Sequence, residues 1–154
     1  MGDTSMKYTI LAVDDSPENL EVLKHLLVPQ YLLRGAIDGS IALKIVASHP
    51  PDLILLDIMM PGMDGYEVCR QLQMDPVTSN IPVIFLTSQD TFQDEAKGLM
   101  LGAADFLMKP IDPKQLLTRI RVQLSRVARW KEREAVLLAK IANLEAELAR
   151  LKRQ

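Results

Sequence analysis

Residues Leu53 to Gly65 read Leu-Ile-Leu-Leu-Asp-Ile-Met-Met-Pro-Gly-Met-Asp-Gly. Four apolar residues lead directly to Asp57, and a short apolar run bounded by turn residues is typical of a strand buried on both faces of a parallel sheet. Pro61, Gly62 and Gly65 cannot continue a strand, so the chain is expected to turn there. Asp57 is therefore predicted at the carboxyl end of a central strand, where open α/β sheets place their ligand crevice. From this stretch alone, an aspartate that merely caps a loop is the alternative.

The chain has the length of one domain with an appendage. Its 154 residues are 48% hydrophobic, which is enough for a full core. No apolar run reaches 18 residues and the first seven residues carry no signal-peptide core, so no transmembrane helix or leader is expected. A single cysteine, Cys69, fits a reducing cytoplasm and is interpreted as a small buried hydrophobe. His25 and His49 lack neighbours at ligand spacing and are interpreted as surface residues.

Charge is unevenly distributed along the chain. The formal net charge is −2, but the segment from Arg119 to Gln154 holds ten basic residues against four glutamates, a net charge of +6. The remainder of the chain therefore carries a net charge of −8. This asymmetry predicts a compact acidic body followed by a basic tail.

Strand-like and helix-like segments alternate five times. Strands are predicted at residues 8–13, 31–36, 53–57, 83–86 and 105–108, with helices between them and a long helix after Asp112 and Pro113. Asp38-Gly39 is interpreted as a turn before the second helix. This alternation predicts an α/β fold, a doubly wound five-stranded parallel sheet of flavodoxin-like order 2-1-3-4-5 with helices on both faces. In that order, the carboxyl ends of strands one, three, four and five surround one crevice.

Chemically capable residues stand at those four strand ends: Asp14 and Asp15, Asp57, Thr87, and Lys109. Three carboxylates in one crevice repel one another and need a cation, and ligation by oxygen alone favours Mg²⁺. Lys109 supplies a positive charge and Thr87 a hydroxyl donor, which suit a phosphoryl group beside the metal. An aspartate carboxylate can accept such a group as an acyl phosphate.

These motifs resemble the CheY-like receiver domain of response regulators in two-component signalling, over about residues 7–126. The resemblance implies that Asp57 is the phosphoacceptor and that the donor is a sensor histidine kinase or a phosphotransfer protein. It also implies that Asp15 binds Mg²⁺ directly, that Asp14 binds it mainly through water, and that the backbone carbonyl of Met59 is a further ligand. No expected active-site residue is missing.

The resemblance extends to the switch of the family. Thr87 and Lys109 would contact the phosphoryl oxygens, and a cis peptide before Pro110 would aim the lysine into the site. Phe106 stands at the aromatic switch position, without the hydroxyl of the tyrosine often found there. Met59 and Gln89 occupy positions that tune the lifetime of the phosphoryl group in the family.

The tail shows three-four spacing of apolar residues. Eight of ten seam positions are apolar; positions a are Ile120, Val127, Glu134, Ile141 and Leu148, and positions d are Gln123, Trp130, Leu137, Leu144 and Leu151. In a parallel pair, Lys140 would face the partner's Glu145 and Glu147 the partner's Lys152, whereas Arg126 opposite Lys131 is unfavourable.

This pattern predicts two regions, a receiver domain at residues 1–126 and a coiled-coil extension at 127–154 that continues the last helix and forms a homodimer. The alternative is one amphipathic helix that packs back on its own domain, but about 40 helical residues span about 60 Å, far more than such a domain. Basic residues are interleaved on all helix faces without aromatic platforms, so nucleic-acid binding is not expected.

The function expected is a phosphorylation-controlled switch, not an enzyme beyond its own phosphorylation and dephosphorylation. It would signal through the face of the fourth helix, fifth strand and fifth helix, and through the coil, to an output domain or partner. One alternative is a haloacid-dehalogenase-like phosphatase, which needs a second acid where Met59 stands. Another is a structural dimerisation module with a vestigial acidic site. The sequence up to Gln154 contains no effector domain, so we expect either a stand-alone dimeric regulator or the front of a longer protein, such as a cyclic-dinucleotide enzyme or a histidine kinase.

Overall fold

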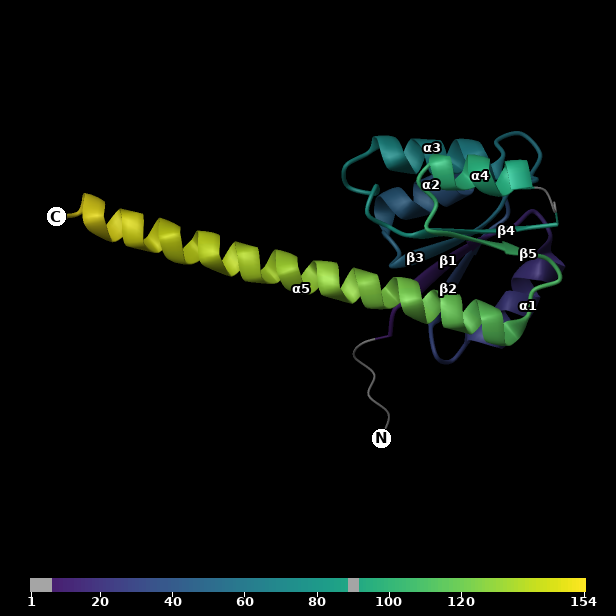
Figure 1. The fold of residues 1–154 in the computed structure, drawn as a ribbon, viewed down its shortest axis with the longest axis horizontal. Helices are drawn as coiled ribbons and strands as arrows, with labels where there is room; N and C mark the ends of the chain where they lie inside the picture. Colours follow the sequence, from purple (N-terminus) through teal and green to yellow (C-terminus); the bar gives the residue numbers. More distant parts are fainter. Residues whose placement is uncertain (1–6, 89–91) are drawn as a thin grey trace.

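The structure, a computed structural model, describes residues 7–88 and 92–154 (Figure 1). Strands and helices alternate strictly along the chain, as the sequence predicts. The strands are β1 (Thr9–Val13), β2 (Leu32–Ala36), β3 (Leu53–Asp57), β4 (Val83–Thr87) and β5 (Asp105–Met108). The helices are α1 (Pro17–Leu27), α2 (Gly39–Ser48), α3 (Gly65–Met74), α4 (Phe92–Met100) and α5 (Pro113–Lys152).

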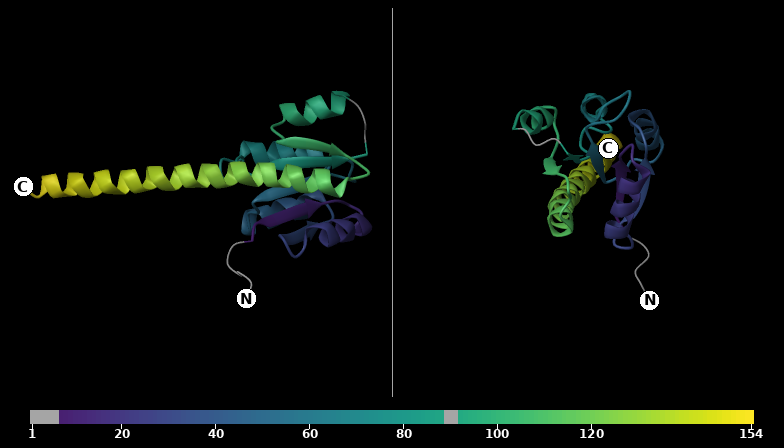
Figure 2. Two further views of the ribbon diagram at one scale, coloured as in Figure 1. Left: turned by 60° about the horizontal axis from the view of Figure 1, so that its bottom comes forward. Right: turned by 90° about the vertical axis from the view of Figure 1, so that its right-hand side faces the viewer.

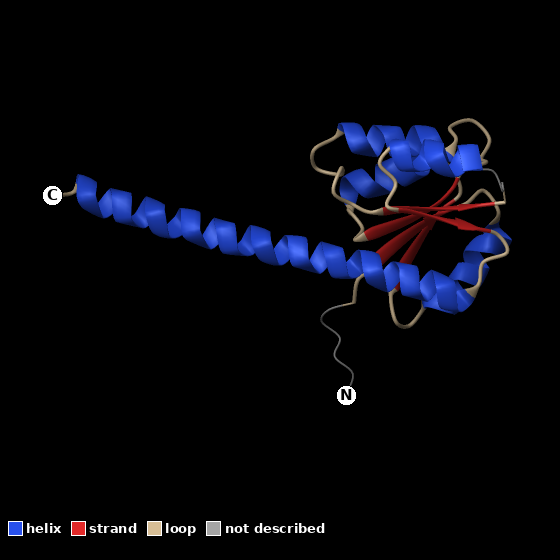
Figure 3. Cartoon of the chain, in the orientation of Figure 1, coloured by secondary structure: helices blue, strands red, loops and turns tan. Residues whose placement is uncertain are grey.

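All strand pairs of the sheet, which is drawn in red in Figure 3, are parallel, and the strand order is β2-β1-β3-β4-β5. This order confirms the predicted doubly wound sheet and places β3 at its centre. All five residues of β3 are buried, which explains why the strand is an unbroken apolar run rather than an alternating one.

Helices cover both faces of the sheet. One face packs against α2, α3 and α4, and the opposite face against α1 and α5 (Figures 1 and 2). Successive residues of β3 point to opposite sides. Thus Ile54 and Leu56 join the first core, whereas Leu53 and Leu55 join the second.

The prediction of a turn at Asp38-Gly39 is wrong for Gly39: the chain bends at Asp38, but Gly39 is already the first residue of α2. Asp38 is the N-cap, and its Oδ1 accepts a hydrogen bond of 2.8 Å from the amide of Ile41. A carboxylate that satisfies a free amide in the first turn stabilises a helix start. Gly39 is required by packing, since a Cβ there would lie 2.7 Å from the side chain of Val68 on α3.

Several single-residue predictions are confirmed. Cys69 is fully buried, and burial raises the pKa of its thiol to about 11. Both histidines are exposed. Gly102, with φ of 96°, follows the end of α4 in the left-handed region that favours glycine. Asp112 caps α5, with Pro113 in its first turn.

Helix α5 has two distinct parts. Its first turns lie in the core, where Leu116, Ile120 and Leu124 pack against the sheet and Gln123 is also buried. Its second half projects away from the body (Figure 2). The predicted coiled-coil seam therefore cannot begin at Ile120 and Gln123, because these two positions already contact the chain's own core. In the part of the chain that the structure describes, no helix combines the length and the apolar character needed to cross a membrane.

Candidate functional site

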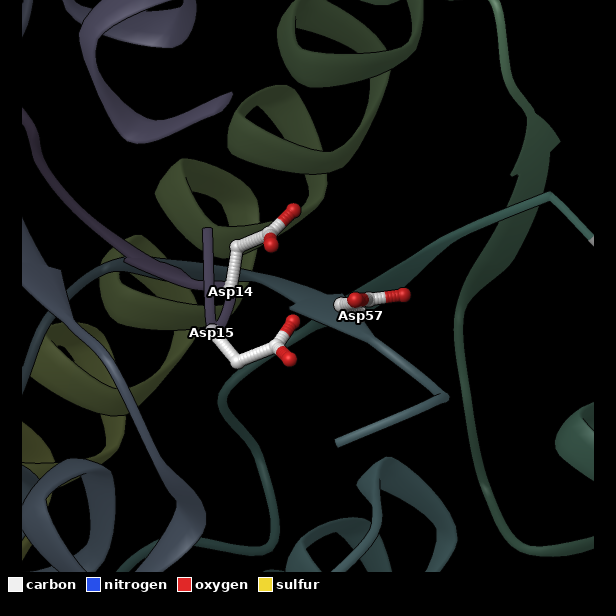
Figure 4. Close-up of side chains that lie close together, drawn as sticks. All are labelled: Asp14, Asp15 and Asp57. Atoms are coloured by element: carbon white, nitrogen blue, oxygen red, sulfur yellow. The ribbon is translucent and has the colours of Figure 1, made fainter. Parts of the chain in front are cut away.

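Acidic residues meet at the carboxyl edge of the sheet. Asp14 and Asp15 follow β1, Asp57 ends the neighbouring strand β3, and their side chains lie close together (Figure 4). One carboxylate oxygen from each of the three lies within 4.8 Å of the others. Carboxylate oxygens so close to one another repel unless a cation lies between them, and a set of oxygen ligands fits a hard divalent ion.

The two neighbouring aspartates have different surroundings. Asp14 is buried, and its carboxylate accepts hydrogen bonds from the amide of Ser16 at 2.9 Å and from the side chain of Asn19 at 3.1 Å. Asp15 is exposed. The fixed Asp14 can orient the site, while Asp15 remains free to turn toward an ion. Asn19 was not among the predicted site residues, although its place in the first turn of α1, soon after the acid pair, was a usable signal.

Lys109 brings a positive charge into the crevice from the end of β5. Its Nζ lies 3.0 Å from Oδ2 of Asp14 and 3.8 Å from Oδ1 of Asp57. The peptide bond between Lys109 and Pro110 is cis, as the resemblance implied. The amide of Lys109 donates a hydrogen bond of 2.7 Å to the carbonyl of Thr87, which joins the ends of β4 and β5.

Burial dominates the electrostatics of Asp57. Removal from water raises the pKa of its carboxyl from 3.8 to about 6, opposed by the nearby Lys109 and supported by the negative Asp14. A backbone hydrogen bond at Met59 also lowers this pKa, and Asp15 raises it. The carboxyl therefore ionises less readily than an exposed aspartate, and further positive charge at the site would favour its ionised form.

The turn after β3 is shaped by a close backbone approach. The amide of Gly65 donates a hydrogen bond of 2.9 Å to the carbonyl of Ile58. A Cβ at Gly65 would collide with the carbonyl oxygen of Asp57. Helix α3 can therefore begin directly against the site only with glycine there, a role that was not predicted for Gly65 from the sequence. The Met59 side chain is 56% exposed beside this turn.

Thr87 and Phe106 lie on the same face of neighbouring strands. Phe85 pairs with Phe106 and Thr87 with Met108 in the parallel register. Because side chains alternate along a strand, Phe106 and Thr87 are diagonal neighbours on the side covered by α4. Thr87 is fully buried, and the Phe106 ring is half-buried, with its centroid 6.5 Å from that of Phe85. Gln89, the other predicted neighbour of the site, lies outside the described residues.

Comparison with known proteins identifies the class. The model of the response regulator receiver domain matches residues 10–121. The chain therefore belongs to the response regulator receiver domain family, the regulatory modules of two-component signalling. This membership removes the support for a dehalogenase-like phosphatase.

Three relatives illustrate the similarity. A Vibrio cholerae protein named "Probable cyclic di-GMP phosphodiesterase" is 42% identical over 142 residues, which cover 92% of this chain and 31% of that protein. Response regulator PleD of Caulobacter vibrioides is 48% identical over 117 residues, which cover 75% of this chain and 26% of that protein. The solved signal receiver domain of a histidine kinase from Syntrophus aciditrophicus is 39% identical with a TM-score of 0.74, covering 79% of this chain and 93% of that one. The chain thus spans less than a third of the first two relatives.

Proposed function

We propose that the chain is a phosphorylation-controlled switch whose Asp57 accepts a phosphoryl group from a histidine kinase or phosphotransfer protein. The observation that carries this proposal is the convergence on Asp57 of two further carboxylates and the Lys109 ammonium, from the ends of β1 and β5. An oxygen of the Asp57 carboxylate would attack phosphorus as the bond from phosphorus to the donor's imidazole nitrogen breaks. The products are an aspartyl phosphate and a free histidine.

The site residues have separate roles in this proposal. Asp14, Asp15 and Asp57, with the backbone carbonyl of Met59, would hold Mg²⁺, which supplies charge neutralisation at the transferring group. Lys109 would move from Asp14, its partner at 3.0 Å, to the phosphoryl oxygens. The Thr87 hydroxyl would donate to a second phosphoryl oxygen.

A groove beside the site is suited to the phosphoryl donor. Its volume is about 320 Å³, and it leads from Asp14 and Lys109 along α1, past the side chains of Val22 and Leu26, to Ile111. Val22 is 56% exposed there. An apolar contact next to the acceptor would hold a donor protein while its imidazole reaches Asp57. Val22→Asp is expected to slow transfer from the cognate kinase at least tenfold, with no change in labelling by acetyl phosphate.

Phosphorylation would be read in two places. The new charge and acceptor oxygens would draw Thr87 inward and let Phe106 turn, which changes the face of α4, β5 and α5 as a population shift. The tail, residues 127–154, would form a parallel coiled-coil dimer that passes this change to an output domain or partner. Paired charges support the parallel register, Lys140 with the partner's Glu145 and Glu147 with the partner's Lys152.

The test is direct chemical labelling. The protein is treated with acetyl phosphate and Mg²⁺, the adduct is trapped, and it is mapped by mass spectrometry. Label is expected on Asp57 alone, and Asp57→Asn should abolish it. Asp15→Ala should weaken Mg²⁺ binding, because a direct carboxylate ligand is lost. A stable phosphoryl group on Ser88 or Thr87 with Asp57 unmodified would contradict the proposal. Failure to bind Mg²⁺ at all would favour a vestigial site.

A further inference from the structure

A groove of about 710 Å³ lies at the amino edge of the sheet, at the opposite end of the strands from the acidic site. One wall is the base of the tail on α5. The other wall comes from the loops before β3, β4 and β5. It includes four prolines, Pro50, Pro51, Pro76 and Pro82, together with Val77.

The tail presents its seam positions to this groove. Among the α5 residues that line it, Val127, Trp130 and Glu134 are the predicted a, d and a positions of the heptad pattern. The same pattern continues beyond the groove as an uncovered stripe, since Leu137 is 58% and Leu144 66% exposed. The groove and the stripe therefore form one continuous surface rather than two separate ones.

Helix geometry explains how a second helix can follow this surface. A straight α-helix drifts by about 20° per heptad relative to a strict seven-residue repeat. Over the three heptads from Trp130 to Leu151, the stripe turns by about 60°. The seam thus faces the receiver loops near Trp130, at the base of the tail, and turns away from them toward Leu151, at its tip. A parallel helix laid on the tip would enter the groove at the base.

The charges at the base fit a second copy of the chain. In the parallel register, Arg126 would face the partner's Lys131, which is unfavourable for two cations alone. In the structure, Lys131 Nζ lies 3.0 Å from Oδ1 of Asp52, and Oδ2 of Asp52 accepts a hydrogen bond of 2.8 Å from the amide of Thr9. A carboxylate fixed at this place offsets the repulsion. The receiver body thus supplies the counter-charge that the tail lacks.

Exposed apolar area also marks the groove. Val77 is 75% exposed and Trp130 is 46% exposed. Tryptophan buries a large apolar surface and is a frequent anchor of interfaces. In a parallel coil, a d residue packs against its own counterpart and the residues around it, so the partner's Trp130 would lie at the mouth of this groove.

We propose that the amino-edge groove is the base of the dimer interface and receives Trp130 of a second copy of this chain, with Asp52 neutralising the basic residues that meet there. This inference rests on the coiled-coil dimer of the proposed function and adds a contact between each receiver body and the partner's tail. The coil would then be coupled to the receiver at the amino edge, not only along α5.

Trp130 is the only tryptophan of the chain, so its fluorescence reports on the groove directly. Emission and acrylamide quenching are measured across a dilution series, with sedimentation in parallel. In the dimer, we expect a blue shift and at least threefold weaker quenching than in a monomeric Leu144→Asp chain. Val77→Asp should raise the dimer Kd at least tenfold and restore quenching, although Val77 is not in the tail.

Two further variants sharpen the test. Ile37→Asp places the same charge on a half-exposed residue at the opposite edge of the sheet and should change the Kd less than twofold. Asp52→Asn should raise the Kd several-fold at low salt, and the difference should vanish in 1 M salt, where charges are screened within about 3 Å. Labelling of Asp57 by acetyl phosphate checks that each variant is folded.

The possible failures are distinguishable. If the chain is monomeric at every concentration, the dimer itself fails and this inference fails with it. If the dimer forms but Val77→Asp dimerises normally and Trp130 remains as quenchable as in the monomer, the dimer stands and the groove contact is overturned. If Trp130 is already shielded in Leu144→Asp, the chain's own residues close the groove, which also overturns the inference.

Discussion

At the scale of single residues, the Asp57 carboxyl is held in an unfavourable environment. Burial raises its pKa to about 6, and the neighbouring Asp14 adds to the effect. Lys109, at 3.8 Å, offsets only part of it. A buried acid next to other acids destabilises the folded chain, but it leaves the crevice ready for a divalent cation and a phosphoryl group. We expect this destabilisation to appear in the free energy of unfolding of the protein.

Asp57→Asn should stabilise the protein at neutral pH. The folded pKa lies above the unfolded value of 3.8, so the folded state retains a proton that the unfolded state releases. The free energy of unfolding of the wild type should therefore fall as pH rises from about 4 to about 6, by about 1–3 kcal/mol. The variant should lack this fall. Urea unfolding from pH 4 to 8 without Mg²⁺ measures the difference.

Saturating Mg²⁺ should shrink that difference, because a bound cation favours the ionised carboxyl and stabilises the folded state. Glu132→Gln, at an exposed tail position, is the control and should follow the wild-type curve. Equal pH profiles for wild type and Asp57→Asn would show that the buried acid is not destabilising.

Gly65→Ala should damage both stability and phosphorylation. The added Cβ would meet the carbonyl oxygen of Asp57, and relief of such a clash typically costs about 1–3 kcal/mol. The shift falls on the backbone that carries the acceptor, so acetyl phosphate labelling should also slow. Gly35→Ala is the matched control, since its Cβ would meet Leu20 at an ordinary 3.4 Å. A variant that unfolds and labels like the wild type would contradict this account.

At the scale of elements, the diagonal pair on β4 and β5 joins the site to the signalling face. Thr87 ends β4, and Phe106 lies two positions back on the same side of β5. A phosphate-mimic complex should therefore move Phe106 relative to Phe85, because a threonine drawn to the phosphoryl group vacates space beside it. The chain has three phenylalanines, so fluorine NMR of fluorophenylalanine-labelled protein can follow each ring. Thr87→Val should suppress the shift.

One result would contradict this coupling between Thr87 and Phe106. If both residues keep their positions in the complex while affinity for a partner changes, the coupling runs through another element.

Helix α5 is one element with two separable roles. Ile120 is fully buried in the core, whereas Leu144 is 66% exposed on the tail. Ile120→Ala should lower the free energy of unfolding by about 2–5 kcal/mol through lost burial and a residual cavity. Leu144→Ala should leave the unfolding of a dilute monomer unchanged but weaken the dimer. Urea unfolding at nanomolar concentration, paired with sedimentation at micromolar concentration, separates the two. If both variants lost equal amounts of folding stability and of dimer affinity, α5 would not have two separable roles.

At the scale of the whole molecule, the body leaves the outer part of the tail exposed. Four of its seam residues, Ile141, Leu144, Leu148 and Leu151, are each about half or more exposed. Full burial of such side chains contributes roughly 1.5–3 kcal/mol each before ordering costs, so a partner surface would matter to assembly. Truncation after Arg126 should leave a folded, phosphorylatable monomer at micromolar concentration, while the full chain dimerises. Sedimentation of both chains is the measurement.

The truncation has two contrary outcomes. If both chains are monomeric, the tail does not form the interface. If both dimerise equally well, the interface lies on the receiver body instead.

Local patterns in the sequence determined most of the fold. Unbroken apolar runs, caps and turn residues predicted all five strands, the long final helix and the strand order. They also predicted that Asp14, Asp57 and Lys109 meet in one crevice, because each stands at the end of a strand. The strand order then follows from few allowed connections. Strands, caps and turns depend on residues that are adjacent along the chain, so they can be predicted from the sequence alone.

Contacts between distant segments had to come from the tertiary structure. The sequence could not show that Gly39 and Gly65 are required by close packing. Nor could it show that Asp52 reaches Lys131, 79 positions away. The heptad pattern begins at Ile120, yet that residue already packs in the core against the sheet. An apolar stripe on a helix has the same sequence pattern whether it packs on its own domain or on a partner. Which residues are buried depends on the surface that faces the stripe, and only the tertiary structure determines that surface.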